Sequence, residues 1–310
     1  MTTTAKNRSE SNPDIEPDDV LFVGVDMHKK SYSVAVWSQL QHKIVRTWSQ
    51  QADAILLVER IYKEAGDAGI DDVVYEAGGQ GFSAARTLEA HGLPVHVISA
   101  AHIPQASVAK TKSDSIDCAN LARLAALGLL HTVYVLSSDE EAERATMRWR
   151  TTCQREVARQ KTRIKSFLQG HGIAEPEGLE NWSNAAIKAL RRCVKKGTVQ
   201  GATAQAVSDL QFTLGEMVRE LQARQKRLKR ATERVRQMSR REHHAQRHER
   251  LDSVPGVGLL TIMMFLTELP NLELFTSSKQ IASICGLAPH VRQSGKFRDS
   301  GKSVSVRTAA

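Results

Sequence analysis

An apolar segment that runs directly into an acidic residue is the feature that most constrains how this chain can fold. Leu21–Val25 has the composition of a buried strand and is followed at once by Asp26. Two further segments, 32–37 and 43–48, carry the β-branched and aromatic residues of strands. Because only short polar turns separate the three segments, we expect an antiparallel meander whose first strand ends at Asp26.

The segments that follow alternate between helix and strand. A helical apolar spacing covers 53–65, and the short apolar run 72–75 has the pattern of a buried strand that ends at Glu76. After the turn at Gly78 and Gly79, the pattern predicts a helix over 82–91, a strand over 94–98 and an amphipathic helix over 114–127. This alternation predicts an α/β domain.

Four carboxylates recur at informative places in that domain: Asp26, Glu76, Asp114 and Asp117. The first two follow strands, and the last two are three residues apart and therefore share one helix face. A cluster of four anions is costly without cations, and oxygen-only ligation suits Mg²⁺ or Mn²⁺. Taken singly, each acid could instead be a helix cap, a solvated first-turn residue or a strand-end charge. Their order along the chain is that of RNase H-like nucleases.

From residue 137 the sequence becomes helical. Ser138 and Glu141 have the spacing of a capping box, and a helical pattern runs from there to Gly170. Apolar residues then recur at alternating spacings of three and four over 207–238. Such a seam predicts a coiled-coil hairpin or a dimer helix.

Positive charge is concentrated on the same part of the chain. The net charge is +9 with an isoelectric point near 9.5, and residues 219–250 hold twelve basic against four acidic side chains. A solvated coiled-coil face is one interpretation, but this density of one sign favours binding to phosphates. The residues we expect to contact nucleic acid are Arg224, Lys226, Arg227, Lys229, Arg230, Arg234, Arg236, Arg240 and Arg241.

A glycine-rich turn opens the last segment. Pro255-Gly256-Val257-Gly258 precedes an apolar helical run. Such a turn leaves backbone N–H groups free to meet a phosphate, so Gly256 and Gly258 are candidate nucleic-acid contacts. A plain structural turn is the alternative.

Other features restrict the class of protein. The sequence has no apolar run of about 18 residues and no secretory signal, so we expect a cytoplasmic protein without a membrane partner. The four cysteines stand apart from one another, with no CxxC or Cys/His cluster, so we expect neither a zinc site nor a disulfide framework. His28 could approach a metal bound at Asp26. His244 and His248 are spaced for a metal, but we expect their rings to be solvated or to face phosphate.

Several motifs together resemble the IS110 family of insertion-sequence transposases. In the first half they are Val23-Gly-Val-Asp-Met-His-Lys29, Tyr75-Glu-Ala-Gly78 and Lys110-Thr-Lys-Ser-Asp-Ser-Ile-Asp-Cys-Ala-Asn-Leu121. Downstream they are Ser253-Val-Pro-Gly-Val-Gly258, Phe275, Gly286-Leu-Ala-Pro289 and Arg292-Gln-Ser-Gly295. Their order and spacing cover most of the chain.

This resemblance implies an RNase H-like (RuvC-like) N-terminal domain whose Asp26, Glu76, Asp114 and Asp117 bind Mg²⁺ or Mn²⁺. It also implies a coiled-coil middle and a small, mostly helical C-terminal domain with Ser294 as nucleophile, where Arg292 and Lys296 contact nucleic acid. The family acts on double-stranded DNA and uses a structured guide RNA. A homo-oligomer, dimer or tetramer, is expected to bring the serine of one subunit to the carboxylates of another.

The expected organisation has four parts: a disordered tail over 1–19, a RuvC-like domain over 20–136, a helical basic linker over 137–250 and a C-terminal domain over 251–310. The family continues further past its Ser-Gly motif than this sequence does, so a truncated copy is one interpretation. Ser300 repeats the local Ser-Gly-Lys pattern, and only the spacing from Gly286–Pro289 favours Ser294.

Three other functions remain open. One is a RuvC-like structure-specific nuclease that uses the carboxylates alone. Another is a non-catalytic nucleic-acid-binding remnant of a transposase. Actin-like ATPases and sugar kinases share the opening Gly24-Val-Asp26, but the second phosphate-binding turn that they need is missing from the sequence.

Overall fold

A computed structural model of the chain describes residues 15–79, 81–99, 114–195, 197, 199–287, 290–294 and 297–301. The chain divides into two compact units, Met1–Ser138 with Ser283–Ala310 and Asp139–Ala282. Within the described ranges, no helix combines the length and the apolar character needed to cross a bilayer.

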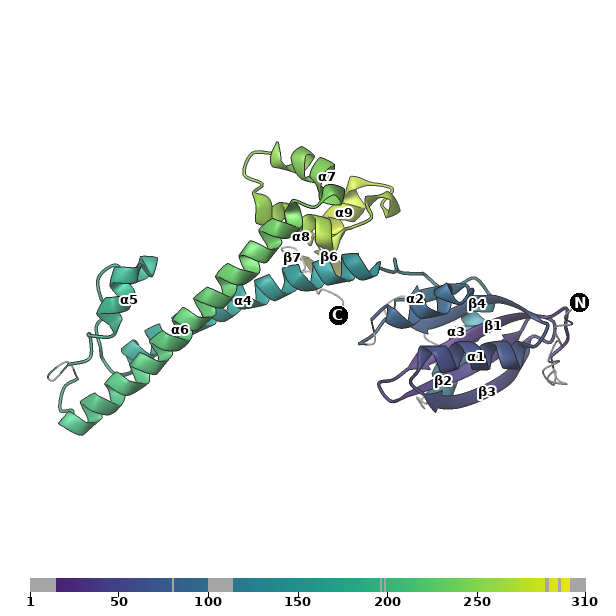
Figure 1. The fold of residues 1–310 in the computed structure, drawn as a ribbon, viewed down its shortest axis with the longest axis horizontal. Helices are drawn as coiled ribbons and strands as arrows, with labels where there is room; N and C mark the ends of the chain where they lie inside the picture. Colours follow the sequence, from purple (N-terminus) through teal and green to yellow (C-terminus); the bar gives the residue numbers. More distant parts are fainter. Residues whose placement is uncertain are drawn as a thin grey trace, which may run out of the picture. The chain divides into compact units, whose positions relative to one another are not determined.

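The first unit is built on a five-stranded mixed sheet (Figure 1). Its strands are β1 (Val20–Met27), β2 (Ser31–Ser38), β3 (Lys43–Gln51), β4 (Gly69–Glu76) and β5 (Val95–Ile98). They lie in the order β3-β2-β1-β4-β5. The first three strands form the expected antiparallel meander, and β4 and β5 run parallel to β1. This is the strand order of an RNase H-like fold, so the predicted fold class is confirmed.

Helices cover both faces of this sheet. On one face, Leu57 of α1 (Ala54–Ala65) and Leu88 of α2 (Ser83–Ala90) share a buried core with Val73 and Tyr75. On the other face, Leu121 of α3 (Asp114–Ala126) packs with Val74. Because successive side chains of a strand point to opposite faces, even-numbered positions at the end of β4 face α3.

The prediction of a disordered tail over residues 1–19 is wrong for residues 15–19. Ile15 is buried in the core of the sheet, and Asp19 is 1% exposed. The Asp19 carboxylate accepts hydrogen bonds from the Ser38 hydroxyl and from the backbone N–H groups of Val20 and Leu40. These contacts fix residues 15–19 against the start of the sheet, while residues 1–14 lie outside the described part of the chain.

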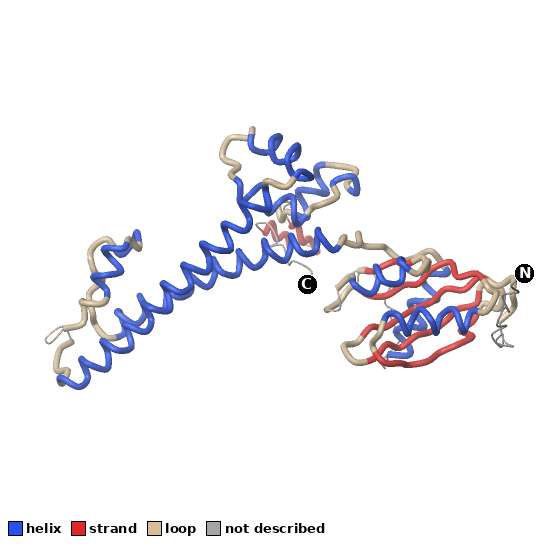
Figure 2. The backbone as a smooth tube through the Cα atoms, in the orientation of Figure 1, coloured by secondary structure: helices blue, strands red, loops and turns tan. Residues whose placement is uncertain are grey.

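The second unit contains a long antiparallel helical hairpin. Helices α4 (Ser138–Gly170) and α6 (Ala204–Ser239) lie side by side, with η2 (Leu179–Asn181) and α5 (Asn184–Leu190) between them in sequence (Figures 1 and 2). The Gln160 side chain donates to the Met217 carbonyl, and Arg227 of α6 pairs with Glu156 of α4. Seam residues of α6 are buried in the same core as α4 residues. The hairpin interpretation of the seam is therefore the one that the structure shows.

Four short helices are described after α6: α7 (Glu242–Asp252), α8 (Leu259–Glu268), η3 (Leu272–Leu274) and α9 (Ser278–Ile284). Met147 of α4, Val235 of α6 and Ile262 of α8 share one buried core. Arg148 forms a two-pronged ion pair with Glu268 at the end of α8. Residues 251–282 thus belong to the unit that holds the hairpin. The remaining strands, β6 (His290–Ser294) and β7 (Phe297–Gly301), pair as an antiparallel hairpin.

Candidate functional site

Two of the predicted acids end neighbouring parallel strands. Val25 of β1 is registered against Tyr75 of β4, and Asp26 and Glu76 are the next residues of the two strands. Asp26 shares the α3 face with Gly24, and Glu76 shares it with Val74, because residues two apart in a strand point the same way. Asp26 is partly buried and Glu76 is exposed.

Helix α3 brings a third acid to this edge. Its backbone crosses β1 at Gly24, where an added Cβ would lie 2.1 Å from the Cys118 carbonyl oxygen. Asp117 is the residue before Cys118 and is exposed. Burial raises the pKa of the Cys118 thiol to about 11, and the nearby charges of Asp26 and Asp117 raise it as well. The Cys118 thiol therefore lies near both carboxylates.

The three acids with described side chains lie at one edge of the sheet but do not form one compact cluster. Within the described part of the chain, the carboxylate oxygens of Asp26, Glu76 and Asp117 do not all lie within 4.8 Å of each other. Repulsion between like charges opposes a closer approach. Asp114 is the first residue of α3, and the structure describes its backbone but not its side chain.

His28 contacts one of these acids, which the sequence pattern alone left open. Its Nε2 lies 3.1 Å from Oδ2 of Asp26. The tight turn between β1 and β2 places it there, since the His28 N–H donates to the Ser31 carbonyl. Proximity in sequence to a strand-end acid was the only signal for this contact.

The donor set suits a hard divalent cation. Asp26, Glu76 and Asp117 offer only carboxylate oxygens at the carboxyl ends of parallel strands and on the helix above them. Carboxylate oxygens are the protein ligands that Mg²⁺ and Mn²⁺ prefer. The residues present therefore fit such an ion.

The predicted nucleophile lies on the C-terminal hairpin. Ser294 is the last residue of β6 and is registered against Phe297, while Ser300 lies on β7 against Val291. The backbone of Arg292 is described, but the side chains of both strands are not, and Lys296 lies outside the described residues.

The predicted basic contacts on α6 and directly after it fall into two groups. Arg224 and Arg227 pair with Glu156 of α4, and Arg241 pairs with Glu143, so these three cations bind one part of the fold to another. The other predicted contacts are exposed or partly exposed: Lys226, Lys229, Arg230, Arg234, Arg236 and Arg240. We call these six residues the basic stripe.

The glycine-rich turn has the backbone geometry expected for it. Gly256 adopts a φ of +83°, which an L-residue rarely tolerates. Gly258 is the N-cap of α8, and no side chain caps that helix. The first N–H groups of α8 are therefore not bound by a capping side chain.

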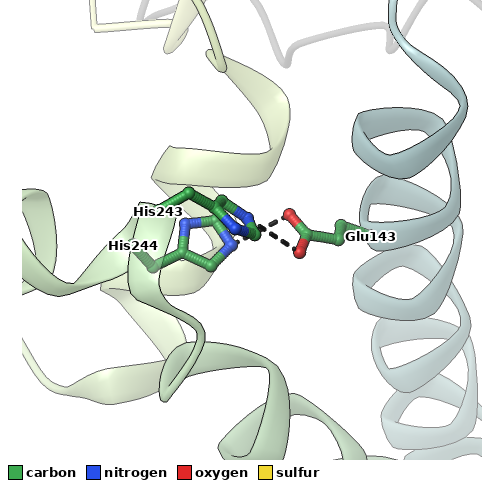
Figure 3. Close-up of side chains that lie close together, drawn as sticks. All are labelled: Glu143, His243 and His244. Carbon is green, nitrogen blue, oxygen red and sulfur yellow. Dashed lines mark hydrogen bonds and ion pairs between the residues drawn. The ribbon is translucent and has the colours of Figure 1, made fainter.

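The expectation of solvated or phosphate-facing histidines is wrong for His244. Its ring is 7% exposed, and its Nε2 lies 2.9 Å from Oε2 of Glu143 (Figure 3). The Nε2 atom of His248 is also buried and has no hydrogen-bond partner in the described structure. These two α7 histidines thus face the protein rather than a phosphate.

Two family models match the chain. Residues 23–173 match a family model for transposases of the IS110 DEDD type, and residues 248–308 match a model described as the transposase IS116/IS110/IS902 family. The first match contains Asp26, Glu76, Asp114 and Asp117, and the second contains Ser294.

Named relatives agree with these models. A Sinorhizobium fredii protein named as a putative transposase, y4qE, is 27% identical over 89% of this chain and 65% of its own length. The transposase for insertion sequence element IS1533 of Leptospira borgpetersenii is 22% identical over 82% of this chain and 70% of its own. The chain thus spans slightly less than two thirds of the first relative.

One solved structure is similar to part of the chain. It is described as "T. thermophilus RuvC in complex with Holliday junction substrate", and the match covers 37% of this chain and 99% of that one, with 14% identity and a TM-score of 0.27. The strand order described above, rather than this match, supports the fold.

Proposed function

The chain belongs to the IS110 family of transposases, and on that premise we propose that it cuts and rejoins DNA as the transposase of an insertion sequence. The observation that carries the proposal is the convergence of Asp26, Glu76 and α3 at one edge of an RNase H-like sheet. In such a fold, acids at this position serve phosphodiester chemistry through divalent metal.

We propose that Asp26, Glu76, Asp114 and Asp117 hold Mg²⁺ or Mn²⁺. When bound, the metal would stabilise the negative charge that develops on the phosphate oxygens during transfer. His28 would hold the Asp26 carboxylate in one orientation, since its Nε2 contacts Oδ2. Gly24 would set how closely Asp117 approaches Asp26, because the α3 backbone rests on it.

Ser294 is the proposed nucleophile. Its Oγ would form a bond to phosphorus as the bridging deoxyribose oxygen leaves with the electron pair of the broken bond and takes up a proton. A serine hydroxyl is a weak nucleophile at neutral pH and needs a base or a metal to remove its own proton. We therefore propose that the β6–β7 hairpin of one subunit acts together with the carboxylates of a second subunit in a homo-oligomer.

The partners proposed are double-stranded DNA and a structured guide RNA. The basic stripe and the turn at Gly256 and Gly258 are the proposed phosphate contacts. Phosphate contacts of this kind are independent of base sequence, so base pairing by an RNA would supply the selectivity.

Trapping of a covalent protein–DNA adduct on a nicked suicide substrate tests this function. Wild-type protein should form the adduct with Mg²⁺ or Mn²⁺ and not with a chelator. Asp26→Asn and Asp117→Asn should abolish it, whereas Asp71→Asn should not, because Asp71 is an exposed acid five residues before Glu76, where β4 shifts its register against β1.

Variants of the two serines distinguish Ser294 from Ser300 as the nucleophile, and the transposase from the alternative functions. Ser294→Ala should abolish the adduct and Ser300→Ala should retain it. Cleavage without any adduct in wild type and in Ser294→Ala would instead favour the nuclease that uses carboxylates alone. Binding without cleavage would favour the non-catalytic remnant.

A further inference from the structure

We propose that Glu143, His243 and His244 form a zinc site, distinct from the carboxylates at the edge of the sheet. Two rings of α7 point their Nε2 atoms at one carboxylate of α4 (Figure 3). Within the described residues, these side chains are the one group of three or more His, Cys, Asp or Glu whose ligand atoms all lie within 4.8 Å of one another.

The spacing of the donor atoms is close to that of a zinc site. His243 Nε2 lies 3.0 Å from Oε1 of Glu143, and His244 Nε2 lies 2.9 Å from Oε2. Ligands at about 2.0–2.2 Å from a tetrahedral Zn²⁺ are separated from each other by about 3.3 Å. Both N···O distances are therefore within a few tenths of an ångström of the separation between two zinc ligands.

Burial distinguishes this group from a surface cluster. The side chains of Glu143 and His244 are 5% and 7% exposed, whereas His243 is 57% exposed and leaves a path by which an ion can reach the other two. A pocket beside them is also lined by Glu140, Arg247 and Thr267. Glu140 or a water molecule from this pocket could complete four-fold coordination.

The donor types select the ion. Imidazole nitrogen suits Zn²⁺ and other transition metals, while Mg²⁺ prefers oxygen ligands alone. The set contains no cysteine, so it does not conflict with the isolated spacing of the four cysteines.

One neighbour opposes the ion. The Arg241 Nη1 lies 2.6 Å from Oε1 of Glu143 and donates a hydrogen bond to it. Arg247, which lines the pocket, donates a hydrogen bond to the Pro270 carbonyl at 2.7 Å. A guanidinium and a metal ion compete for the same carboxylate, so removal of the Arg241 charge should strengthen metal binding. If the cluster serves only as an ion-pair network, loss of Arg241 should weaken that network and should not raise the affinity for a metal ion.

The test is a Zn²⁺ titration of the full chain in competition with a chromophoric chelator, followed by Co²⁺ absorption spectra. Both use an Asp26→Asn, Glu76→Gln background, which removes two of the four proposed ligands at the edge of the sheet and so weakens metal binding there. We expect one Zn²⁺ per chain, a Co²⁺ spectrum of tetrahedral type, and no competition from millimolar Mg²⁺.

Variants assign the site. His243→Ala, at a position that is 57% exposed, should weaken Zn²⁺ binding by more than the roughly 10–100-fold typical of outer-shell partners. His244→Ala should do the same, with folding checked by circular dichroism. His248→Ala is the matched control on the same helix and should leave the affinity unchanged.

Arg241→Gln gives the sharpest result. It should raise the Zn²⁺ affinity by severalfold or more. The proposal is overturned if the background protein binds no Zn²⁺, if His243→Ala binds it as tightly as the background protein does, or if Arg241→Gln fails to raise the affinity. These readouts do not depend on DNA cleavage, so they stand or fall separately from the proposed transposase activity.

Discussion

Gly24 in β1 and Cys118 in α3 are in direct backbone contact. A Cβ at Gly24 would lie 2.1 Å from the Cys118 carbonyl oxygen and 2.6 Å from the Ala122 amide nitrogen. Both distances are far inside van der Waals contact, so only glycine allows the helix to rest on the strand. Since Asp26 is two residues beyond Gly24 and Asp117 is one residue before Cys118, this contact holds the two acids near each other.

Gly24→Ala should therefore damage the candidate metal site as well as the fold. We expect the free energy of unfolding to fall by about 1–3 kcal/mol or more, as for other overpacked positions, and Mn²⁺ affinity to drop. Chemical denaturation and Mn²⁺ titration measure the two effects. Gly69→Ala in β4 is the control, because a Cβ there would lie an ordinary 3.7 Å from the Asp19 carbonyl oxygen. Unchanged Mn²⁺ binding in a folded Gly24→Ala protein would show that this contact does not set the geometry of the acids.

The Cys118 thiol reports on the charge of the same site. Its pKa is raised to about 11, mainly by burial, so at pH 8 it is protonated and should alkylate far more slowly than the exposed Cys285. Alkylation should accelerate only as the pH rises toward that pKa. Asp26→Asn removes a charge that raises the pKa of Cys118, so its alkylation profile should move to lower pH. Mass spectrometry of alkylated peptides checks this, and an unmoved profile would mean that Asp26 does not act on Cys118.

His28 should support the site through Asp26. His28→Ala removes the contact between Nε2 and Oδ2, and we expect Mn²⁺ affinity or cleavage rate to fall about 10–100-fold, as for other outer-shell partners. His96→Ala is a close control, since His96 is similarly exposed and contacts Asp72 of the same sheet at 2.9 Å. Equal losses in both variants would indicate a general effect on the sheet.

The fold of the first unit was largely predictable because periodicity reports burial. The expected strands at 32–37, 43–48 and 72–75 lie within β2, β3 and β4. The structure extends them by pairing, which continues past the apolar residues into polar ones such as Gln51. Residues 15–19 were missed because Asp19 is buried through hydrogen bonds that no apolar pattern indicates.

The residues of the candidate sites were predictable only where their position in the sequence, directly after a predicted strand, fixes their place in the fold. Asp26 and Glu76 follow from strands that end on acids, whereas the contact of His28 depends on a turn conformation. The convergence of Glu143 with His243 and His244 pairs residues about a hundred positions apart in sequence. It depends on the register of the α4–α6 hairpin, which a heptad seam alone does not specify.

The basic stripe should bind phosphates without base preference. Substituting Lys226, Lys229 and Arg230 by Gln should reduce the slope of log affinity against log salt by about 0.9 for each phosphate that these side chains neutralise. Arg155, Arg159 and Arg163 form a matched control, because they lie on α4 and carry the same total charge. Fluorescence anisotropy over a salt series measures the slopes. Equal changes in the two triple variants would mean that net charge, rather than the stripe, controls binding.

Leu214 should stabilise the hairpin within one chain rather than an interface between subunits. It is 1% exposed and shares a core with Ile164 and Leu168 of α4. Leu214→Ala should lower the free energy of unfolding by about 2–5 kcal/mol through cavity formation, while light scattering reports an unchanged mass. Phe212→Ala on the same helix should change stability by less than about 0.5 kcal/mol, since Phe212 is 67% exposed. A smaller species with unchanged stability in Leu214→Ala would instead show that the seam of α6 holds two subunits together.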